Sequence, residues 1–523
     1  MQLTSWKDSQ PPAGYDPETS PLDEHNIKLL DNVHPLGWQQ PAERMKKYNL
    51  VIIGGGAGGL VSAAGSAGVG GKVALIEKHL MGGDCLNVGC VPSKALIRCA
   101  NAARAARSGQ EFGITVGKVE VDFPGIMRRM RRLRADISPT DSCARFQTEL
   151  GIDIFQGTGK FIGPRLIEVN GQKIQFASAV IATGALARVP DIPGIHDVPY
   201  LTNATFFNLT ELPERMVVMG SGPIGLELAQ AMAVLGSKVT VIEKSARVMG
   251  REDPEAAKIV LAQMEKDGVE FITNAKIERF EKDSASSATL VHVDAKSGKQ
   301  TLHADAFLLA IGRVPTVKNL GLEEVGVEYT PERGIKIDDT LHTTASHVFA
   351  VGDCCDAGNK FTHASDFMAR AVIRNALFFG SAKLSKLVIP RATYTEPEVA
   401  AVGATEDQLK KDGTEFLTIV REMADVDRAR LDEQTEGFVK VLAKPGSGEI
   451  FGATIVAPDA GNMISEISVA MAAGMGLGTL ASVIHPYPTQ AEAIRQCGDL
   501  FNKTKLTPFV KGTFDKLLAF RRR

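Results

Sequence analysis

The chain has 523 residues, of which 44% are hydrophobic and 23% charged, a composition typical of a soluble protein with about three or four domains. A formal net charge of −2 and an isoelectric point of about 6.6 argue against a nucleic acid or an anionic membrane as a partner. Seven cysteines are few and odd in number, as expected in a reducing compartment. The opening residues have neither the basic nor the apolar region of a secretory signal, so we expect a cytoplasmic protein.

The first 46 residues are polar and rich in proline and acidic side chains. Only the stretch DEHNIKLLDNV has a helical pattern. We expect residues 1–46 to be an N-terminal extension that packs on the surface of the protein.

A strand, a glycine turn, a helix and a second strand follow in YNLVIIGGGAGGLVSAAGSAGVGGKVALIEK. Gly54, Gly56 and Gly59 have the spacing of a dinucleotide-binding fingerprint, and the second strand ends in an acid, Glu77. In this motif the glycines make a tight turn, let the backbone approach a pyrophosphate and allow close helix–strand packing. The carboxylate of Glu77 can accept a hydrogen bond from a ribose hydroxyl. Because the segment is rich in glycine, it suits this pattern rather than a membrane span.

The same pattern recurs in RMVVMGSGPIGLELAQAMAVLGSKVTVIEK. Here the glycines are Gly220, Gly222 and Gly225, and Glu243 ends the second strand. Two complete fingerprints predict two bound dinucleotides.

Two further glycine turns suit crossings between domains, because each follows an apolar strand. VIATGALARVPDIPG contains Thr183 and Gly184, and LLAIGRVPT contains Gly312. Later, HVFAVGDCCD places Asp353 just after a buried strand, where it can bind a ribityl or ribose hydroxyl or cap the next helix. From about residue 388 the glycine motifs stop, and alternating strands and helices predict a separate α+β domain.

The segment GGDCLNVGCVPSK contains two cysteines, Cys85 and Cys90. Their spacing is not that of a zinc knuckle. A chain of this length also buries a core without needing a structural disulfide.

In this order, the two fingerprints, the Cys-x4-Cys-x3-Lys segment, the ATG motif and the GD motif resemble the flavin-dependent pyridine nucleotide–disulfide oxidoreductases. The resemblance covers about residues 47–500. It implies an α/β fold with two Rossmann-like domains, which bind FAD and NAD(P), and a C-terminal α+β dimerisation domain that forms a homodimer. The expected segments are the extension 1–46, the FAD-binding domain 47–190 and 315–387, the NAD(P)-binding domain 191–314, the dimerisation domain 388–505 and a tail 506–523.

The resemblance also implies roles for the residues around the two cysteines. Cys85 is the interchange thiol that attacks the substrate, and Cys90 lies against the flavin as a charge-transfer thiolate. Lys94 matches a lysine beside the flavin and pairs with Glu227 of GPIGLE. Positions five apart on a regular helix lie about 140° around its axis, so a bridge between the cysteines needs a distorted helix, which Gly89 allows.

Near the C-terminus, disulfide reductases of the family have His-Pro-Thr and a glutamate five residues beyond the histidine. The chain reads HPYPTQAEAI, in which Glu492 fits the glutamate, Tyr487 stands at the histidine position and His485 lies two residues earlier. Each active site in the family is completed by these residues of the partner subunit. A tyrosine, with a pKa near 10, exchanges protons poorly at neutral pH.

Tyrosine at this position resembles the mercuric reductase-like branch, whose substrate is a soft metal ion held transiently by thiolates, here those of Cys85 and Cys90. The GMTCxxC module and the C-terminal cysteine pair of that branch are missing from this sequence. The acceptor therefore stays open between Hg(II), another thiophilic metal ion and a small disulfide. The alternatives are a dihydrolipoamide dehydrogenase-like reductase and a flavin-binding sensor without turnover.

Four further expectations concern single residues or short segments. Glu243 favours NADH over NADPH, although Lys244 and Arg247 could bind a phosphate. His363 either lies beside the flavin or caps a helix in solvent. The remaining cysteines are expected to be buried thiols, namely Cys99, Cys143, Cys354, Cys355 and Cys497. The basic run RRMRRLR, residues 128–134, is expected to be a solvated helix face.

Overall fold

The computed structural model describes residues 5–8, 19–41, 47–358 and 360–523. The chain forms two compact units. One comprises the chain up to Ala246 together with Gly268–Leu387, and the other comprises Arg247–Asp267 together with Val388–Arg523.

The largest sheet of the first unit has the strand order β3-β2-β1-β6-β5-β4, and β18 pairs with residues 179–181 of β6, beyond the stretch that pairs with β5. Its strands are β1 (Lys47–Ile53), β2 (Val73–Glu77), β3 (Asp153–Gln156), β4 (Lys160–Gly163), β5 (Leu166–Val169), β6 (Gln172–Ile181) and β18 (Val348–Ala350). The pairs that join β3, β2, β1, β6 and β18 are all parallel, so the carboxyl ends of these strands meet at one edge.

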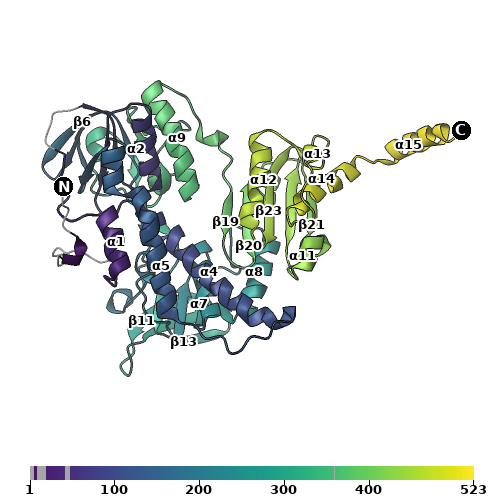
Figure 1. Ribbon diagram of the computed structural model, residues 1–523, viewed down its shortest axis with the longest axis horizontal. Coiled ribbons are helices and arrows are strands. Elements are labelled where there is room, and N and C mark those ends of the chain that lie inside the picture. Colours follow the sequence, from purple (N-terminus) through teal and green to yellow (C-terminus); the bar gives the residue numbers. More distant parts are fainter. Residues whose placement is uncertain (1–4, 9–18, 42–46, 359) are drawn as a thin grey trace. The chain divides into compact units, whose positions relative to one another are not determined.

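Two helices cover one face of this sheet side by side, α2 (Ala57–Gly68) and α9 (Thr362–Phe378) (Figure 1). They approach closely at Gly65, where a Cβ would lie 2.4 Å from Cδ1 of Ile373. The short helix α3 (Gly83–Val88) and the long helices α4 (Cys90–Arg107) and α5 (Phe123–Ile137) follow β2.

A second parallel sheet of the first unit has the order β10-β9-β8-β14, with α7 (Pro223–Leu235) between β8 and β9. The remaining strands form a three-stranded sheet, β11-β12-β13, and two ribbons, β15-β7 and β16-β17. Their bounds are β7 (Ala185–Ala187), β8 (Arg215–Met219), β9 (Lys238–Ile242), β10 (Val269–Ile272), β11 (Lys276–Lys282), β12 (Thr289–Ala295), β13 (Gly298–Ala304), β14 (Ala306–Leu309), β15 (Arg313–Pro315), β16 (Tyr329–Thr330) and β17 (Gly334–Ile335); the short helix α6 is Asn203–Phe206.

The second unit is built on an antiparallel sheet of order β19-β20-β23-β22-β21. Its strands are β19 (Arg391–Thr393), β20 (Glu398–Gly403), β21 (Leu417–Glu422), β22 (Phe438–Ala443) and β23 (Ile450–Ala457). Its helices are α8 (Pro254–Lys266), α10 (Glu406–Lys411), α11 (Asp427–Leu431), α12 (Ala460–Ala472), α13 (Leu477–Leu480), α14 (Glu492–Thr504) and α15 (Pro508–Arg521), of which α15 buries no residue. The predicted α/β class with a C-terminal α+β domain is confirmed.

The N-terminal extension contributes to the core of the first unit. The expected helix forms as α1 (Glu24–Val33), which packs against α5 (Figure 1). Leu29 and Leu30 are fully buried, and the buried indole of Trp6 donates a hydrogen bond to the carbonyl oxygen of His34 at 2.9 Å. The described part of the extension thus packs on the rest of this unit, and the leucine stripe of α1 joins its hydrophobic core. The other residues of 1–46 lie outside the described ranges.

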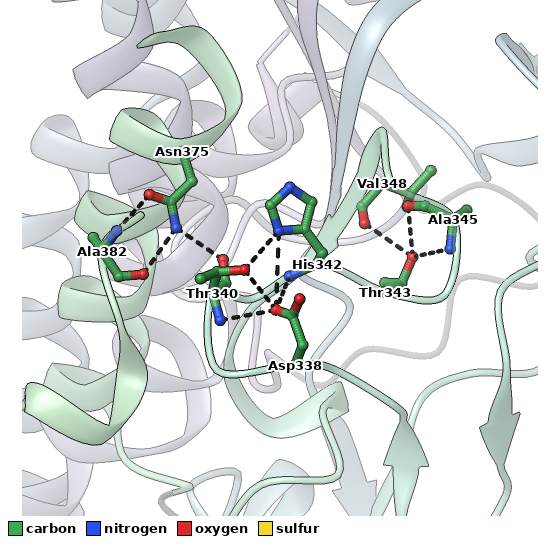
Figure 2. A network of polar contacts seen from close by, with 8 residues as sticks. All are labelled: Asp338, Thr340, His342, Thr343, Ala345, Val348, Asn375 and Ala382. Atoms are coloured by element: carbon green, nitrogen blue, oxygen red, sulfur yellow. Dashed lines mark hydrogen bonds and ion pairs between the residues drawn. The ribbon is translucent and has the colours of Figure 1, made fainter. Parts of the chain in front are cut away.

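A polar network fixes the loop before β18 to the end of α9 (Figure 2). The carboxylate of Asp338 accepts hydrogen bonds from the backbone of Thr340 and of His342 at 2.8 and 3.0 Å. The amide of Asn375, which is 5% exposed, donates to the carbonyl oxygens of Thr340 and Ala382 and accepts from the N–H of Ala382. One asparagine thus satisfies three main-chain groups of two loops.

We expect Asn375→Ala to lower the free energy of unfolding by about 2–4 kcal/mol, because three main-chain groups lose their partner. Thermal unfolding and the rate of amide exchange at Ala382 measure the effect. Thr344→Ala is the control, since the exposed Thr344 makes hydrogen bonds in the same region and its loss should cost about 0.5 kcal/mol. Equal effects of the two variants would contradict this prediction.

Candidate active site

The first glycine motif lies between β1 and α2. Gly54 has a φ of +111°, and a Cβ there would lie 2.3 Å from the carbonyl oxygen of Ala182. A Cβ at Gly59 would lie 1.8 Å from the carbonyl oxygen of Gly54, so only glycine lets the helix begin this close to the strand. A Cβ at Gly56 would meet only Cα of Gly83, at 3.8 Å, and no side chain caps the N-terminus of α2. The turn thus leaves room beside uncapped helix N–H groups, which favour a phosphate.

Two half-buried carboxyl groups lie at the same edge of this sheet. Glu77, at the end of β2, accepts hydrogen bonds from the N–H groups of Gly55 and His79 at 2.5 and 2.6 Å. Asp353 follows β18, with Oδ2 3.6 Å from Nε of Arg313. Burial raises the pKa of both carboxyl groups.

The second glycine motif lies between β8 and α7. A Cβ at Gly225 would lie 2.3 Å from the carbonyl oxygen of Gly220, whereas a Cβ at Gly222 would meet open space. Glu243, after β9, accepts hydrogen bonds from Oγ of Ser221 at 2.6 Å and from the N–H of Ser245 at 2.7 Å. Burial alone would raise the pKa of Glu243, but these hydrogen bonds hold it below its ordinary value.

Thr183, Gly184 and Gly312 join the two crossings between the two parallel sheets. Oγ1 of Thr183 donates to the carbonyl oxygen of Thr316 at 2.6 Å, and the N–H of Thr316 donates to Gly184 at 2.9 Å. The carbonyl oxygen of Gly312 accepts from Arg188 at 2.9 Å.

Cys85 and Cys90 lie where one helix is interrupted. Cys85 is in α3, Cys90 begins α4, and Gly89 separates the two helices. Both thiols are free, Cys85 half-buried and Cys90 exposed. A hydrogen bond between them lowers the pKa of Cys90 to about 6 and raises the pKa of Cys85. Of the two thiols, Cys90 therefore has the lower pKa.

Further contacts stabilise charge beside Cys90. Its Sγ lies 3.4 Å from Oγ1 of Thr362, at the start of α9. Nζ of Lys94, one turn along α4, lies 2.7 Å from Oε2 of Glu227 in α7, whose side chain is 7% exposed. Thr362, which can donate to the thiolate, and the ammonium of Lys94, which attracts it, lower the pKa of Cys90, whereas the carboxylate of Glu227 raises it.

Three residues that the sequence analysis did not single out hold α3 in place. The guanidinium of Arg313 pairs with the carboxylate of Asp84, next to Cys85. The amide of Asn203 donates to the carbonyl oxygen of Val88 at 3.3 Å. Arg313 follows Gly312 in the predicted crossing LLAIGRVPT, and this position next to a predicted glycine turn is the signal in the sequence that points to Arg313.

The basic run 128–134 in α5 is not uniformly solvated. Arg131 is 6% exposed and Arg134 is fully buried, so the prediction is wrong for these two residues. They lie four and seven positions beyond the buried Met127, on the apolar face of the helix.

In the second unit, Tyr487 and His485 differ sharply in exposure. Tyr487 is 72% exposed, and its hydroxyl donates to Oδ2 of Asp427 at 3.1 Å, a contact that raises the pKa of Tyr487. The side chain of His485 is 6% exposed, with Nε2 2.9 Å from Oε1 of Glu466. Glu492 is buried at the start of α14, 3.5 Å from Arg495. Tyr487 thus presents its ring to solvent, whereas His485 is turned into its own unit.

The other predicted residues have the following environments. His363 is exposed at the start of α9, and its ring stacks on that of Phe361 at 5.4 Å. Four of the remaining cysteines are buried as expected, whereas Cys99 is only half-buried. Among the described residues, no group of three or more histidine, cysteine or acidic side chains could hold a metal ion. No helix in the described ranges is long and apolar enough to cross a membrane.

Two glycine cradles on parallel sheets, with a dithiol between helices beside the first, define a flavoprotein disulfide reductase. Comparison with known proteins supports this class. Residues 48–371 match the pyridine nucleotide-disulphide oxidoreductase family, and residues 389–497 match the dimerisation domain of that family. The chain therefore belongs to the pyridine nucleotide–disulphide oxidoreductases, in class I, and the dimerisation domain supports a homodimer.

Similar proteins have different names. The mercuric reductase of Bacillus cereus is 34% identical over 87% of this chain and 72% of its own length. The dihydrolipoyl dehydrogenase of Geobacillus stearothermophilus is 31% identical over 86% of this chain and 95% of its own. A structure of a Cu(II) complex of the HOCl-induced flavoprotein disulfide reductase RclA from Escherichia coli has a TM-score of 0.76 and 29% identity, over 86% of this chain and 98% of that one.

The family uses FAD and takes electrons from a pyridine nucleotide. The first glycine turn fits FAD, because the space at Gly56 and the uncapped end of α2 suit a pyrophosphate. Asp353 and Glu77 place carboxyl oxygens at the same edge of the sheet, where they would suit sugar hydroxyls.

We expect the thiolate of Cys90 to give long-wavelength absorption beside the flavin in the two-electron-reduced protein. Because the pKa of Cys90 is lowered to about 6, the band should persist at neutral pH and disappear as the pH falls through about 6. Anaerobic reduction at a series of pH values measures the midpoint.

Cys90→Ser should abolish the band at every pH. Cys85→Ala should raise the midpoint, since it removes the hydrogen bond that stabilises the thiolate. A band that survives in Cys90→Ser would show that another group is responsible.

Proposed function

We propose that this protein is an NADH-driven reductase that passes electron pairs through Cys85 and Cys90 to a thiophilic metal ion, Hg(II) or another soft cation. A small disulfide is the second candidate acceptor. The turn from Gly54 to Gly59 would hold FAD, which would supply the two-electron chemistry that links the nicotinamide to the disulfide between the two cysteines.

The two thiols have different tasks in this proposal. Cys90 holds the negative charge, because Cys85, Thr362 and Lys94 all stabilise its thiolate. Cys85 attacks or binds the acceptor once its proton has been lost. Soft cations bind thiolate sulfur, so the reduced pair forms a transient metal site.

The observation that carries the choice of acceptor is the state of Tyr487. In disulfide reduction a proton must reach the leaving thiolate, and an imidazole supplies it readily at neutral pH. The raised pKa of Tyr487 makes its hydroxyl a poor donor. Within its own unit His485 does not take the place of Tyr487 as a proton donor, because its side chain faces Glu466 and is 6% exposed. A metal ion needs no such proton.

The names of similar proteins support both acceptor classes. Mercuric reductases and the Cu(II) complex of RclA agree with a metal ion. Dihydrolipoyl dehydrogenases agree with a disulfide such as lipoamide, but Tyr487 argues against it. Because the family consists of oxidoreductases, a flavin-binding sensor without turnover is the weaker alternative. We also propose that the partner subunit's C-terminal domain completes each active site.

We expect turnover with Hg(II) to exceed turnover with glutathione disulfide or lipoamide in a panel of NADH-driven assays. Tyr487→His should raise kcat/KM for disulfides by about tenfold or more, because it restores a proton donor. Tyr487→Phe is the matched control, since it changes the ring without adding an imidazole. Cys85→Ser should abolish turnover with every acceptor while reduction of the flavin survives.

If Tyr487→His and Tyr487→Phe affect disulfide turnover equally, pocket shape and not proton supply selects the acceptor. Faster wild-type turnover with a disulfide than with every metal ion tested would reject the proposed acceptor.

We further propose a preference for NADH. The ionised carboxylate of Glu243 can accept hydrogen bonds from a ribose, and it repels a 2′-phosphate. Arg247 is occupied, because its guanidinium donates to the carbonyl oxygens of Gly250 and Glu252 at 2.9 and 3.0 Å. Lys244 is exposed.

Glu243→Ala should lower the ratio of kcat/KM for NADH to that for NADPH by about tenfold, equivalent to about 1.4 kcal/mol. Arg247→Ala should leave the ratio unchanged. A wild-type ratio below one would contradict the preference.

A further inference from the structure

The main chain between the two reactive cysteines is held from outside α3. Asn87 lies between Cys85 and Cys90 and is 2% exposed. Its amide donates to the carbonyl oxygens of Met81 and Gly83 at 3.0 and 2.9 Å. Its own carbonyl oxygen accepts a hydrogen bond from Nη1 of Arg134 in α5. This contact is two residues from the break at Gly89.

Arg134 is a fully buried cation with few neighbours that could satisfy it. Burial lowers the pKa of Arg134 to about 10, so the guanidinium still carries its charge at neutral pH. Its Nη2 donates to Oδ1 of Asn26 at 2.7 Å, and Asn26 is itself fully buried. Leaving a buried charge without hydrogen-bond partners costs much free energy, so the loss of either acceptor would destabilise the buried guanidinium of Arg134.

Asn26 belongs to the N-terminal helix α1, which is anchored at its first turn. Nδ2 of Asn26 donates to the carbonyl oxygen of Pro21 at 2.7 Å, and Asp23 caps the helix. Oδ2 of Asp23 also accepts from Nε of the buried Arg131 at 2.6 Å. Two guanidinium groups of α5 therefore meet the same turn of α1.

We infer that the N-terminal helix braces the redox centre: Asn26 holds Arg134, and Arg134 holds the carbonyl of Asn87 and with it the interrupted helix that brings Cys85 and Cys90 together. Asn26 and Arg134 are positioning residues in this arrangement. The inference rests on the redox role proposed for the two cysteines and does not depend on the acceptor.

The brace has a consequence for the thiol–disulfide equilibrium. A disulfide forms only when the two Cβ atoms approach within about 4 Å at a suitable angle. A looser α3 would let the thiols separate, which lowers the equilibrium constant for closing the bridge. In closing, each thiol loses a proton and the pair loses two electrons to glutathione disulfide, which becomes two glutathione molecules.

The test uses the full-length, FAD-loaded protein, equilibrated in glutathione redox buffers. Acid quenching, alkylation and mass spectrometry give the fraction with a Cys85–Cys90 disulfide. Asn26→Ala should lower the equilibrium constant about fivefold, a shift of about 20 mV towards a more oxidising midpoint. Arg134→Lys should shift it in the same direction, because lysine lacks the fork that reaches both acceptors.

Two variants separate the brace from general loosening of the extension. Asn26→Asp keeps an oxygen for Arg134 but cannot donate to Pro21, so it should stay within about twofold of the wild type. Lys28→Ala removes a 2.7 Å ion pair between Lys28 of α1 and Asp136 of α5 without touching Arg134, and it should also stay within about twofold.

An unchanged equilibrium constant in both Asn26→Ala and Arg134→Lys would overturn the brace, as would an equal shift in Lys28→Ala. If Asn26→Ala does not fold, the equilibrium constants measured for Arg134→Lys and Asn26→Asp test the brace in its place. A wild-type protein that forms no Cys85–Cys90 disulfide would overturn the proposed function as well, which distinguishes the two failures.

Discussion

The placement of the two thiols depends on a close approach of the main chain to itself at Gly89. A Cβ at this position would lie 2.7 Å from the carbonyl oxygen of Asp84, so no larger residue allows the same path. The approach ends α3 and lets α4 begin at the next residue, and the thiols of Cys85 and Cys90, which a regular helix would hold apart, are in contact. The unequal pKa values of Cys85 and Cys90 follow from their contact, and the contact follows from the interruption.

The elements that depend on local sterics could be predicted from the sequence. The glycine turns are such elements, because a tight turn and a close helix–strand contact exclude a Cβ at fixed spacings. The strands and helices around them follow the apolar period. The α/β class and the two nucleotide cradles were therefore readable without a structure.

The supports of the dithiol could not be read in the same way, because they depend on tertiary burial. The run 128–134 has the charge of a solvated face, yet Arg134 is buried because α1 covers it and offers Asn26 as a partner. The spacing of Met127 and Met130 is the signal in the sequence for a buried face of α5, but the many charges of the run favour a solvated helix. Exposure near the C-terminus could not be predicted from the sequence either. The side chain of His485 is buried in its own unit, whereas Tyr487 is exposed to solvent.

The ribbon of β7 and β15 joins the two crossings of the chain between the nucleotide-binding sheets. These strands pair antiparallel from Ala185 to Ala187 and from Arg313 to Pro315, so the chain leaves the first sheet and returns to it at one place. The segment from Arg188 to Gly312 is therefore, in topology, a single insertion between β6 and β18, which pair directly with each other. Because its two ends are adjacent, the first sheet keeps every one of its strands without it.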